Sequence, residues 1–96
     1  MSSEPFSVHC SPLGFGWECS VFVGSAVEGV EHLVTVSRVE LGRYAPAASE
    51  PTPLVEESFR FLLEREPATA ILRKFALSEI ERYFPDYRAE IAARLR

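Results

Sequence analysis

Two histidines and two cysteines are the residues of this chain whose chemistry most resembles that of a metal site. His9, Cys10, Cys19 and His32 could together supply the nitrogen and sulfur ligands of a tetrahedral zinc ion. The spacing of these four residues disfavours a zinc site. His9 and Cys10 are neighbours in an alternating segment and therefore point to opposite faces of a strand. No two cysteines are separated by the about two to four residues of a zinc knuckle. We predict no metal and no cofactor, and keep these four residues as weak metal candidates.

The same residues have simpler structural interpretations. Cys10 and Cys19 share the core-facing parity of a predicted hairpin, which favours two buried structural thiols. A cross-strand disulfide formed after oxidation is the alternative. His32 alternates in phase with apolar neighbours, which favours a partly buried structural histidine over a ligand.

The sequence offers little for nucleophilic catalysis. The G-x-S-x-G motif is absent, and no cysteine precedes an electropositive helix start. A triad of His32, Asp86 and a serine is conceivable, but nothing in the sequence brings these residues together. The glutamate pairs Glu56–Glu57 and Glu64–Glu66 are typical of solvated helix faces. We therefore predict a non-enzymatic protein, with an enzyme or small-ligand binder that uses His32 as an alternative.

Aromatic residues give the strongest indication of a binding role. Phe15 lies between two turn glycines and is followed closely by Trp17. The alternative is that Phe15 folds back onto the edge of the sheet. Phe22 and Leu33 lie on the parity opposite the strand core, so they are either covered by helices or form an interaction patch. These four residues are candidate binding residues.

The charge distribution bears on the class of partner. The net charge is −4, and the whole acidic excess lies in residues 1–51. Neither half carries the positive excess that phosphate binding needs, which disfavours nucleic acid. Arginine is enriched at protein interfaces, so Arg73 and Arg82 join the candidate binding residues. Nucleic-acid binding through the Arg-bearing helices, by Arg73, Lys74, Arg82 and Arg88, is the main alternative function.

Alternation in the first half predicts a small sheet. "FSVHC", "WECSVFV" and "VEHLVTV" alternate apolar and polar residues, and "SPLGFG" and "GSAVEG" between them carry turn residues. We predict a three-stranded antiparallel β-meander over about residues 6–36. "SRVE" then has the spacing of a capping box from Ser37 to Glu40, which predicts a short helix over about 38–44. A Pro-rich loop follows over 45–53.

The second half predicts a helical layer over about residues 53–96. Thr52 is expected to cap a helix whose first residue is Pro53. A second helix is predicted over "ATAILRKF", burying Ile71, Leu72 and Phe75. "SEIE" repeats the capping-box spacing at Ser78 and Glu81, and a last helix follows Pro85. The predicted fold is a single α+β domain, residues 1–96, with four or five short helices packed on the sheet.

The tail resembles a known sequence pattern. "FRFLLEREP", "AILRKF" and "IERYFPDY" resemble a family of short uncharacterised bacterial proteins whose tail reads F-x-F-L-L-E-R-E-P, then I-L-x-x-F, then I-x-x-Y-F-P-x-Y. The resemblance covers about the last 45 residues well and the sheet only loosely. It implies a fold, with a strand-rich part before this tail, and carries no activity.

We expect a small protein-interaction domain. A chain of 96 residues buries only ~60–65% of its unfolded surface, so association with a partner, including a second copy, would stabilise it. The start of the sequence lacks a basic and apolar leader, and no segment approaches the ~18 apolar residues of a membrane span. We predict a cytoplasmic protein with a protein partner and no membrane contact.

Overall fold

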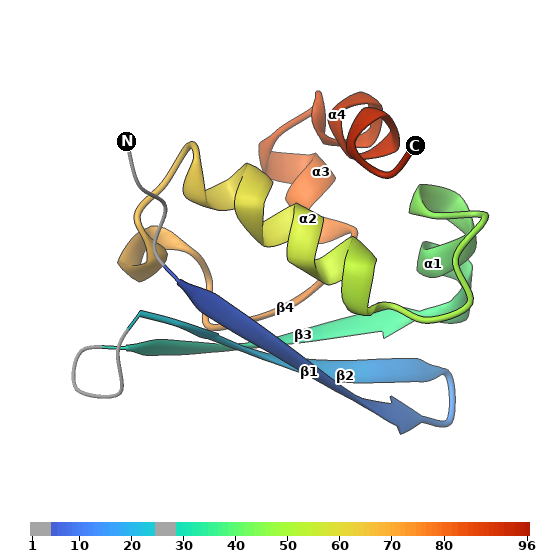
Figure 1. The fold of residues 1–96 in the computed structure, drawn as a ribbon, viewed down its shortest axis with the longest axis horizontal. Helices are drawn as coiled ribbons and strands as arrows, with labels where there is room; N and C mark the ends of the chain where they lie inside the picture. Colours follow the sequence, from blue (N-terminus) through green and yellow to red (C-terminus); the bar gives the residue numbers. More distant parts are fainter. Residues whose placement is uncertain (1–4, 25–28) are drawn as a thin grey trace.

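The computed structural model describes residues 5–24 and 29–96, and places the helices together on one face of a sheet (Figure 1). The predicted α+β class is confirmed. The sheet has four strands in the order β1-β2-β3-β4, one more than the predicted meander.

The predicted meander forms the first three strands. β1 (Phe6–Leu13), β2 (Gly16–Val23) and β3 (Val30–Ser37) pair antiparallel in sequence order. Their alternating apolar residues point toward the helices, since every second residue of a strand faces the same side. The predicted second turn lies largely in residues 25–28, outside the described residues.

The prediction of a second helix over "ATAILRKF" is wrong. Residues Ala68–Ala70 form a single 3-10 turn, η1, and Lys74–Ala76 form β4, which pairs parallel with β3. The N–H of Leu33 donates to the carbonyl of Arg73 at 2.7 Å, and the N–H of Leu77 donates to that of Thr35 at 2.9 Å. The free edge of β3 thus supplies backbone partners that override the helical spacing of this segment. The side chain of Leu72, expected in the core, is exposed.

The first helix, α1 (Arg38–Tyr44), begins where it was predicted. The hydroxyl of Ser37 accepts from the N–H of Glu40 at 3.0 Å, and the carboxylate of Glu40 accepts from the N–H of Ser37 at 2.8 Å. This is the reciprocal capping box expected from "SRVE".

The longest helix, α2 (Thr52–Leu63), lies across the sheet without the predicted cap. Thr52 is its first residue, Pro51 precedes it, and no side chain caps it. The helix forms because a proline is tolerated in the first turn and because one stripe of side chains is apolar. That stripe is buried against the sheet and α4, and comprises Leu54, Val55, Phe59, Phe61 and Leu62.

The last two helices, α3 (Glu79–Tyr83) and α4 (Tyr87–Arg94), are separated by Pro85 as expected. The capping box predicted at Ser78 and Glu81 is wrong, because Ser78 has helical backbone angles and its side chain caps nothing. Its N–H instead donates to the carboxylate of Glu40 at 2.9 Å. In the same turn, the carboxylate of Glu79 accepts from the N–H of Ala76 at 3.1 Å.

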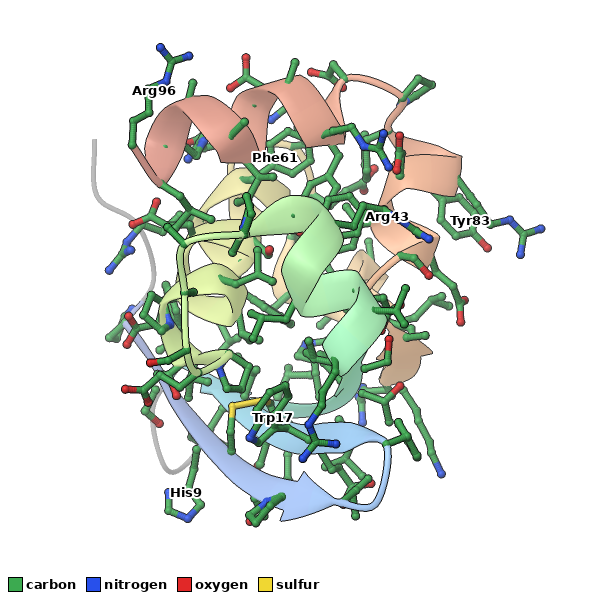
Figure 2. All side chains as sticks on the ribbon, turned by 90° about the vertical axis from the view of Figure 1, so that its right-hand side faces the viewer. His9, Trp17, Arg43, Phe61, Tyr83 and Arg96 are labelled. Carbon is green, nitrogen blue, oxygen red and sulfur yellow. A yellow bond between two sulfur atoms is a disulfide. The ribbon has the colours of Figure 1, made fainter. Side chains whose placement is uncertain are left out.

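A buried pair of hydroxyl groups joins α2 and α4. The hydroxyl of Ser58 donates to the carbonyl of Leu54 at 2.7 Å, so the hydroxyl of Tyr87, 2.6 Å away, donates to Ser58. Burial raises the pKa of the Tyr87 hydroxyl far above its ordinary value, which keeps it a donor. This pair fixes α4 against α2, the layer above the sheet in Figure 2.

Glu40 joins three parts of the fold and should therefore be sensitive to substitution. Burial by itself would raise the pKa of Glu40, but hydrogen bonds from Ser37 and Ser78 outweigh it and hold the pKa below its ordinary value. We expect Glu40→Gln to lower the free energy of unfolding at pH 7 by about 1–3 kcal/mol, because hydrogen bonds to a charged acceptor are lost. Urea denaturation measures this.

The effect of Glu40 should also depend on pH in one direction. A carboxylate whose pKa is lower in the folded state contributes stability above its unfolded pKa, about 4.3, and loses it as pH falls through the folded value. The stability gap between the native chain and Glu40→Gln should therefore narrow below about pH 4. Glu50→Gln, at an exposed loop position, is the control. A gap that stays constant with pH would contradict this account of Glu40.

Candidate interaction site

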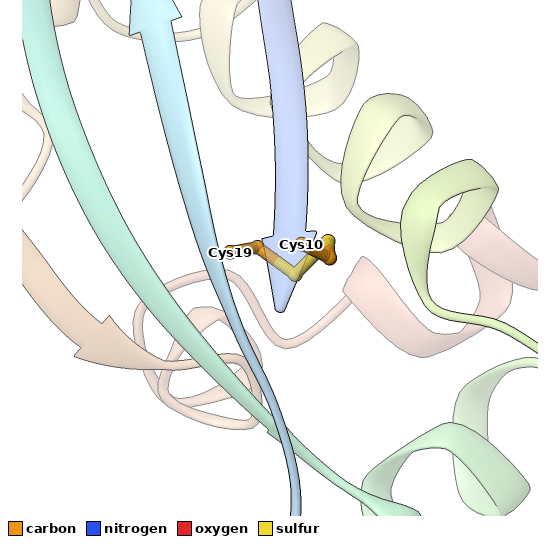
Figure 3. Close-up of a disulfide and its surroundings, with 2 residues drawn as sticks. All are labelled: Cys10 and Cys19. Atoms are coloured by element: carbon orange, nitrogen blue, oxygen red, sulfur yellow. A yellow bond between two sulfur atoms is a disulfide. The ribbon is translucent and has the colours of Figure 1, made fainter. Parts of the chain in front are cut away.

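The four metal candidates are not brought together. Cys10 and Cys19 face each other across β1 and β2 and are joined by a disulfide (Figure 3). His9 points away from them into solvent, on the other face of β1. In the described part of the chain, no group of three or more His, Cys, Asp or Glu residues could hold a metal ion.

The structure contains the disulfide in place of the two free thiols that the parity favoured. Cys19 is fully buried, so the bond is part of the core, as core-facing parity implies. Disulfides are typical of oxidising compartments, so this bond gives no support to the predicted cytoplasmic location.

His32 is buried inside the core. Its Nδ1 lies 2.7 Å from the carbonyl oxygen of Leu72, which can only accept, so Nδ1 carries the proton. Its ring packs 5.4 Å from that of Phe59, and Nε2 has no hydrogen-bond partner among the described residues. Asp86, the suggested triad partner, is bound to Arg65 at 2.8 Å. His32 therefore holds the segment before β4 onto β3.

Phe15 is exposed, which overturns the alternative that it folds back. Its side chain is 57% exposed at the tip of the β1–β2 turn. Arg38 fixes this turn: its N–H donates to the carbonyl of Phe15 at 3.0 Å, and its guanidinium donates to that of Gly14 at 3.1 Å. The guanidinium also lies 5.4 Å from the ring of half-buried Trp17. Gly16 is required here, because a Cβ atom would collide with backbone atoms of β3.

Phe22 and Leu33 are half-buried and alternate with buried core residues of β2 and β3, so they point to the face of the sheet away from the helices. The helices do not cover them. Their surroundings are polar, since Ser20 donates to the carboxylate of Glu31 at 2.7 Å on the same face. On this face, Phe22 and Leu33 thus form a small apolar patch with polar neighbours.

The basic residues singled out from the sequence differ in whether an acidic group of the described chain offsets their charge. Arg73 and Arg82 are exposed, and neither forms an ion pair within the described residues. Arg88 lies 3.9 Å from the carboxylate of Glu81, which offsets its charge.

Sequence reasoning missed the open edge of β1. The N–H of Gly24 donates to the carbonyl of Pro5 at 2.8 Å, which sets the phase of the β1–β2 ladder. Because hydrogen-bonded and non-hydrogen-bonded pairs alternate, the odd-numbered residues of β1 bond to β2. The even-numbered residues, from Phe6 to Pro12, direct their backbone groups away from the sheet. Within the described residues, no hydrogen bond to these groups is found.

An apolar groove was also missed. It encloses about 320 Å³ between the end of α2, the segment from η1 to β4, and α3. Two glutamates, Glu66 and Glu79, line it together with apolar and aromatic side chains, mainly Leu62, Ile71, Leu72, Phe75, Ile80, Tyr83 and Phe84. The sequence carries no direct signal for it, because Leu72 was predicted to be buried in a helix and is exposed in the structure.

Comparison of the chain with protein-family models, curated proteins and solved structures finds no match. The tail resemblance therefore stays a prediction. Among the described residues, no helix is long and apolar enough to span a bilayer.

The disulfide should contribute measurable stability. It closes a loop with a sequence separation of 9, and loop-closure entropy assigns about 2–3 kcal/mol to a bond of this span. Reduction with dithiothreitol should lower the free energy of unfolding by that amount in urea titrations, with free thiols counted by alkylation. The double variant Cys10→Ala and Cys19→Ala should not respond to dithiothreitol. Equal stability of the oxidised and reduced chain would contradict this assignment.

His32 should be required for stability through its hydrogen bond. His32→Leu removes the donor of the hydrogen bond to the carbonyl of Leu72, at a cost of about 0.5–1.5 kcal/mol. His32→Asn places an amide donor near the position of Nδ1 and should retain part of that stability. Chemical denaturation of both variants measures the difference. A leucine variant as stable as the native chain would show that this hydrogen bond contributes nothing.

Proposed function

We propose that this chain is a non-enzymatic protein-interaction domain that pairs with a second copy of itself through β1. The observation that carries the proposal is the open edge of this eight-residue strand. Unpaired backbone groups on an edge strand are a template for another strand, and natural proteins use such edges for β-augmentation.

The backbone geometry of β1 suits this role. The N–H groups of Phe6, Val8 and Cys10 and their carbonyls point outward, with no partner among the described residues. Pro12 lacks an N–H and therefore limits the usable edge to the first part of the strand. A second β1 running antiparallel could satisfy these groups in a continuous sheet.

The side chains of β1 also permit pairing with an identical strand. Edge strands are commonly protected by charged residues, whereas "FSVHCSPL" contains no Asp, Glu, Lys or Arg. Two copies related by a two-fold axis perpendicular to the sheet would keep their helices on the same face. α2 packs on β1, with the rings of Phe59 and Phe6 6.4 Å apart, so the two α2 helices would flank the joint.

The proposal includes a cytoplasmic location for the protein. In a reducing cytoplasm Cys10 and Cys19 would be held as thiols. Strand pairing uses backbone groups and does not depend on the state of these cysteines. The acidic balance of the chain and the buried position of His32 give no specific support to the nucleic-acid and enzymatic alternatives.

Charge placed on the β1 edge should weaken self-association. In any antiparallel β1–β1 register that uses the outward groups, odd-numbered residues face odd-numbered residues. In the register centred on His9, the double variant Ser7→Lys and Ser11→Lys places each lysine opposite a lysine of the second copy. Two such pairs at about 0.2–1 kcal/mol each should raise the dimer Kd by ~2- to 30-fold in sedimentation velocity. Amide exchange at Phe6, Val8 and Cys10 should slow as the native protein concentration rises.

Two controls separate this proposal from its rivals. Ala89→Lys with Ala93→Lys adds the same charge at exposed positions of α4 and should leave the Kd unchanged. Phe22→Lys tests the open face of the sheet. A native chain that stays monomeric at millimolar concentration, or one whose dimer is lost in Phe22→Lys and kept in the β1 variant, would overturn pairing through this edge.

A further inference from the structure

The groove between α2, η1, β4 and α3 combines an apolar floor with unneutralised acidic groups. Its buried floor is formed by Leu62, Ile71, Phe75 and Ile80, with half-buried Phe84 beside them. Leu72 and Tyr83 stand at its rim with 47% and 66% of their surface exposed. Exposed large apolar residues next to a cavity indicate a contact surface rather than a completed core.

The charges of the groove have one sign. Glu66 and Glu79 both line it, and none of its lining residues is basic. Neither carboxylate forms an ion pair within the described residues. One oxygen of Glu79 accepts from the N–H of Ala76 at 3.1 Å, which orients this side chain and leaves its other oxygen without a partner in the described part. An occupant that matches this lining has an apolar group and at least one cation.

The size of the groove limits the occupant further. At about 320 Å³ it lies near the lower end of ligand cavities, which span ~300–1,000 Å³. That volume accommodates one large side chain with its neighbouring backbone. The groove is open toward solvent, since its lining residues Leu72 and Tyr83 are exposed, so an external segment can reach it.

We propose that this groove binds a basic–apolar segment of a partner protein. A leucine or aromatic side chain of that segment fills the apolar floor, and a flanking arginine or lysine lies against Glu66 and Glu79. This site is separate from β1, which forms the opposite edge of the sheet from β4. The proposal holds whether or not two copies pair through β1.

A second copy of this chain is a poorer occupant. Its basic–apolar–basic run is Arg94–Arg96, and Arg94 is already bound to Glu64 at 2.7 Å. Leu95 of the same run is half-buried against the core. Releasing this segment would break existing contacts, whereas an external segment would not.

The proposal is tested with short synthetic peptides. The probe is an acetylated and amidated pentapeptide in which two arginines flank one leucine. One matched peptide carries glutamates in place of the arginines, and another carries alanine in place of the leucine. We expect saturable shifts of the amide NMR signals around Leu72, Phe75 and Tyr83 with the first peptide at low ionic strength, and weaker binding of both matched peptides.

Variants of the groove locate the effect. Glu66→Gln with Glu79→Gln removes both charges and retains an acceptor for Ala76. Exposed ion pairs contribute about 0.2–1 kcal/mol each, so the Kd should rise ~2- to 30-fold. Leu72→Ser alters an exposed side chain of the rim and should weaken binding without unfolding the chain. Glu50→Gln, in the loop before α2, is the matched control and should bind as the native chain does.

Distinct results overturn the proposal. Equal affinity for the alanine peptide would show that the groove attracts cations without recognising the apolar group. Equal affinity for the glutamate peptide would remove the role of Glu66 and Glu79. Concentration-dependent shifts at the groove without peptide would assign it to a second copy. The β1 lysine variant should bind the first peptide normally, so failure of strand pairing and failure of groove binding are distinguished.

Discussion

The buried carboxylate of Glu40 is the interaction on which the arrangement of the helices depends. One of its oxygens accepts from Ser37, where β3 ends and α1 begins, and the other accepts from Ser78, at the start of α3. Segments far apart in the sequence are therefore held by one side chain. The connection between α1 and α3 is reinforced where the hydroxyl of Tyr44 donates to the carboxylate of Glu81 at 2.6 Å. Because α3 forms one wall of the groove, the shape of the groove depends on Glu40 at a distance.

β3 gives the sheet two different edges. It pairs antiparallel with β2 and parallel with β4, and His32 adds a side-chain hydrogen bond to the segment that leads into β4. β4 has three residues and begins with a lysine, which limits pairing at that edge. β1 has eight residues without a formal charge. Among the described residues, β1 is thus the longer open edge of the sheet, while the β4 side carries the groove.

Local patterns predicted the parts of the fold that local interactions determine. Alternation predicted the three long strands, and the "SRVE" spacing predicted the capping box of α1, since both depend on residues close in sequence. β4 could not be predicted in this way. "ATAILRKF" has helical spacing, but it contributes a strand because β3 offers backbone partners about 40 residues earlier in the sequence. The capping box predicted at Ser78 fails for the same reason. The N–H of Ser78 donates to the carboxylate of the distant Glu40 and not to that of Glu81, three residues away in sequence.

The candidate sites were predictable only in part, for the same reason. Phe15 could be singled out because two glycines place it at a turn tip, yet its exposure follows from the way Arg38 holds that turn. Glu66 had been assigned to a solvated helix face from its pairing with Glu64. Tertiary packing instead places it, with Glu79, beside an apolar floor built from three separate elements. No spacing rule connects two glutamates that are joined only through such packing.

The two proposed surfaces differ in what they can recognise. The β1 edge offers backbone groups, which bind any compatible strand and give affinity more than selectivity. The groove offers side chains of defined shape and charge, which discriminate between partners. Since β1 and β4 are opposite edges, pairing through β1 would leave both grooves free at the two ends of a continuous sheet. A partner with two basic–apolar segments could then occupy both, and the second contact would form at the high effective concentration set by the first. Pairing of the β1 strands would in this way raise the affinity for such a partner without changing any residue of the groove.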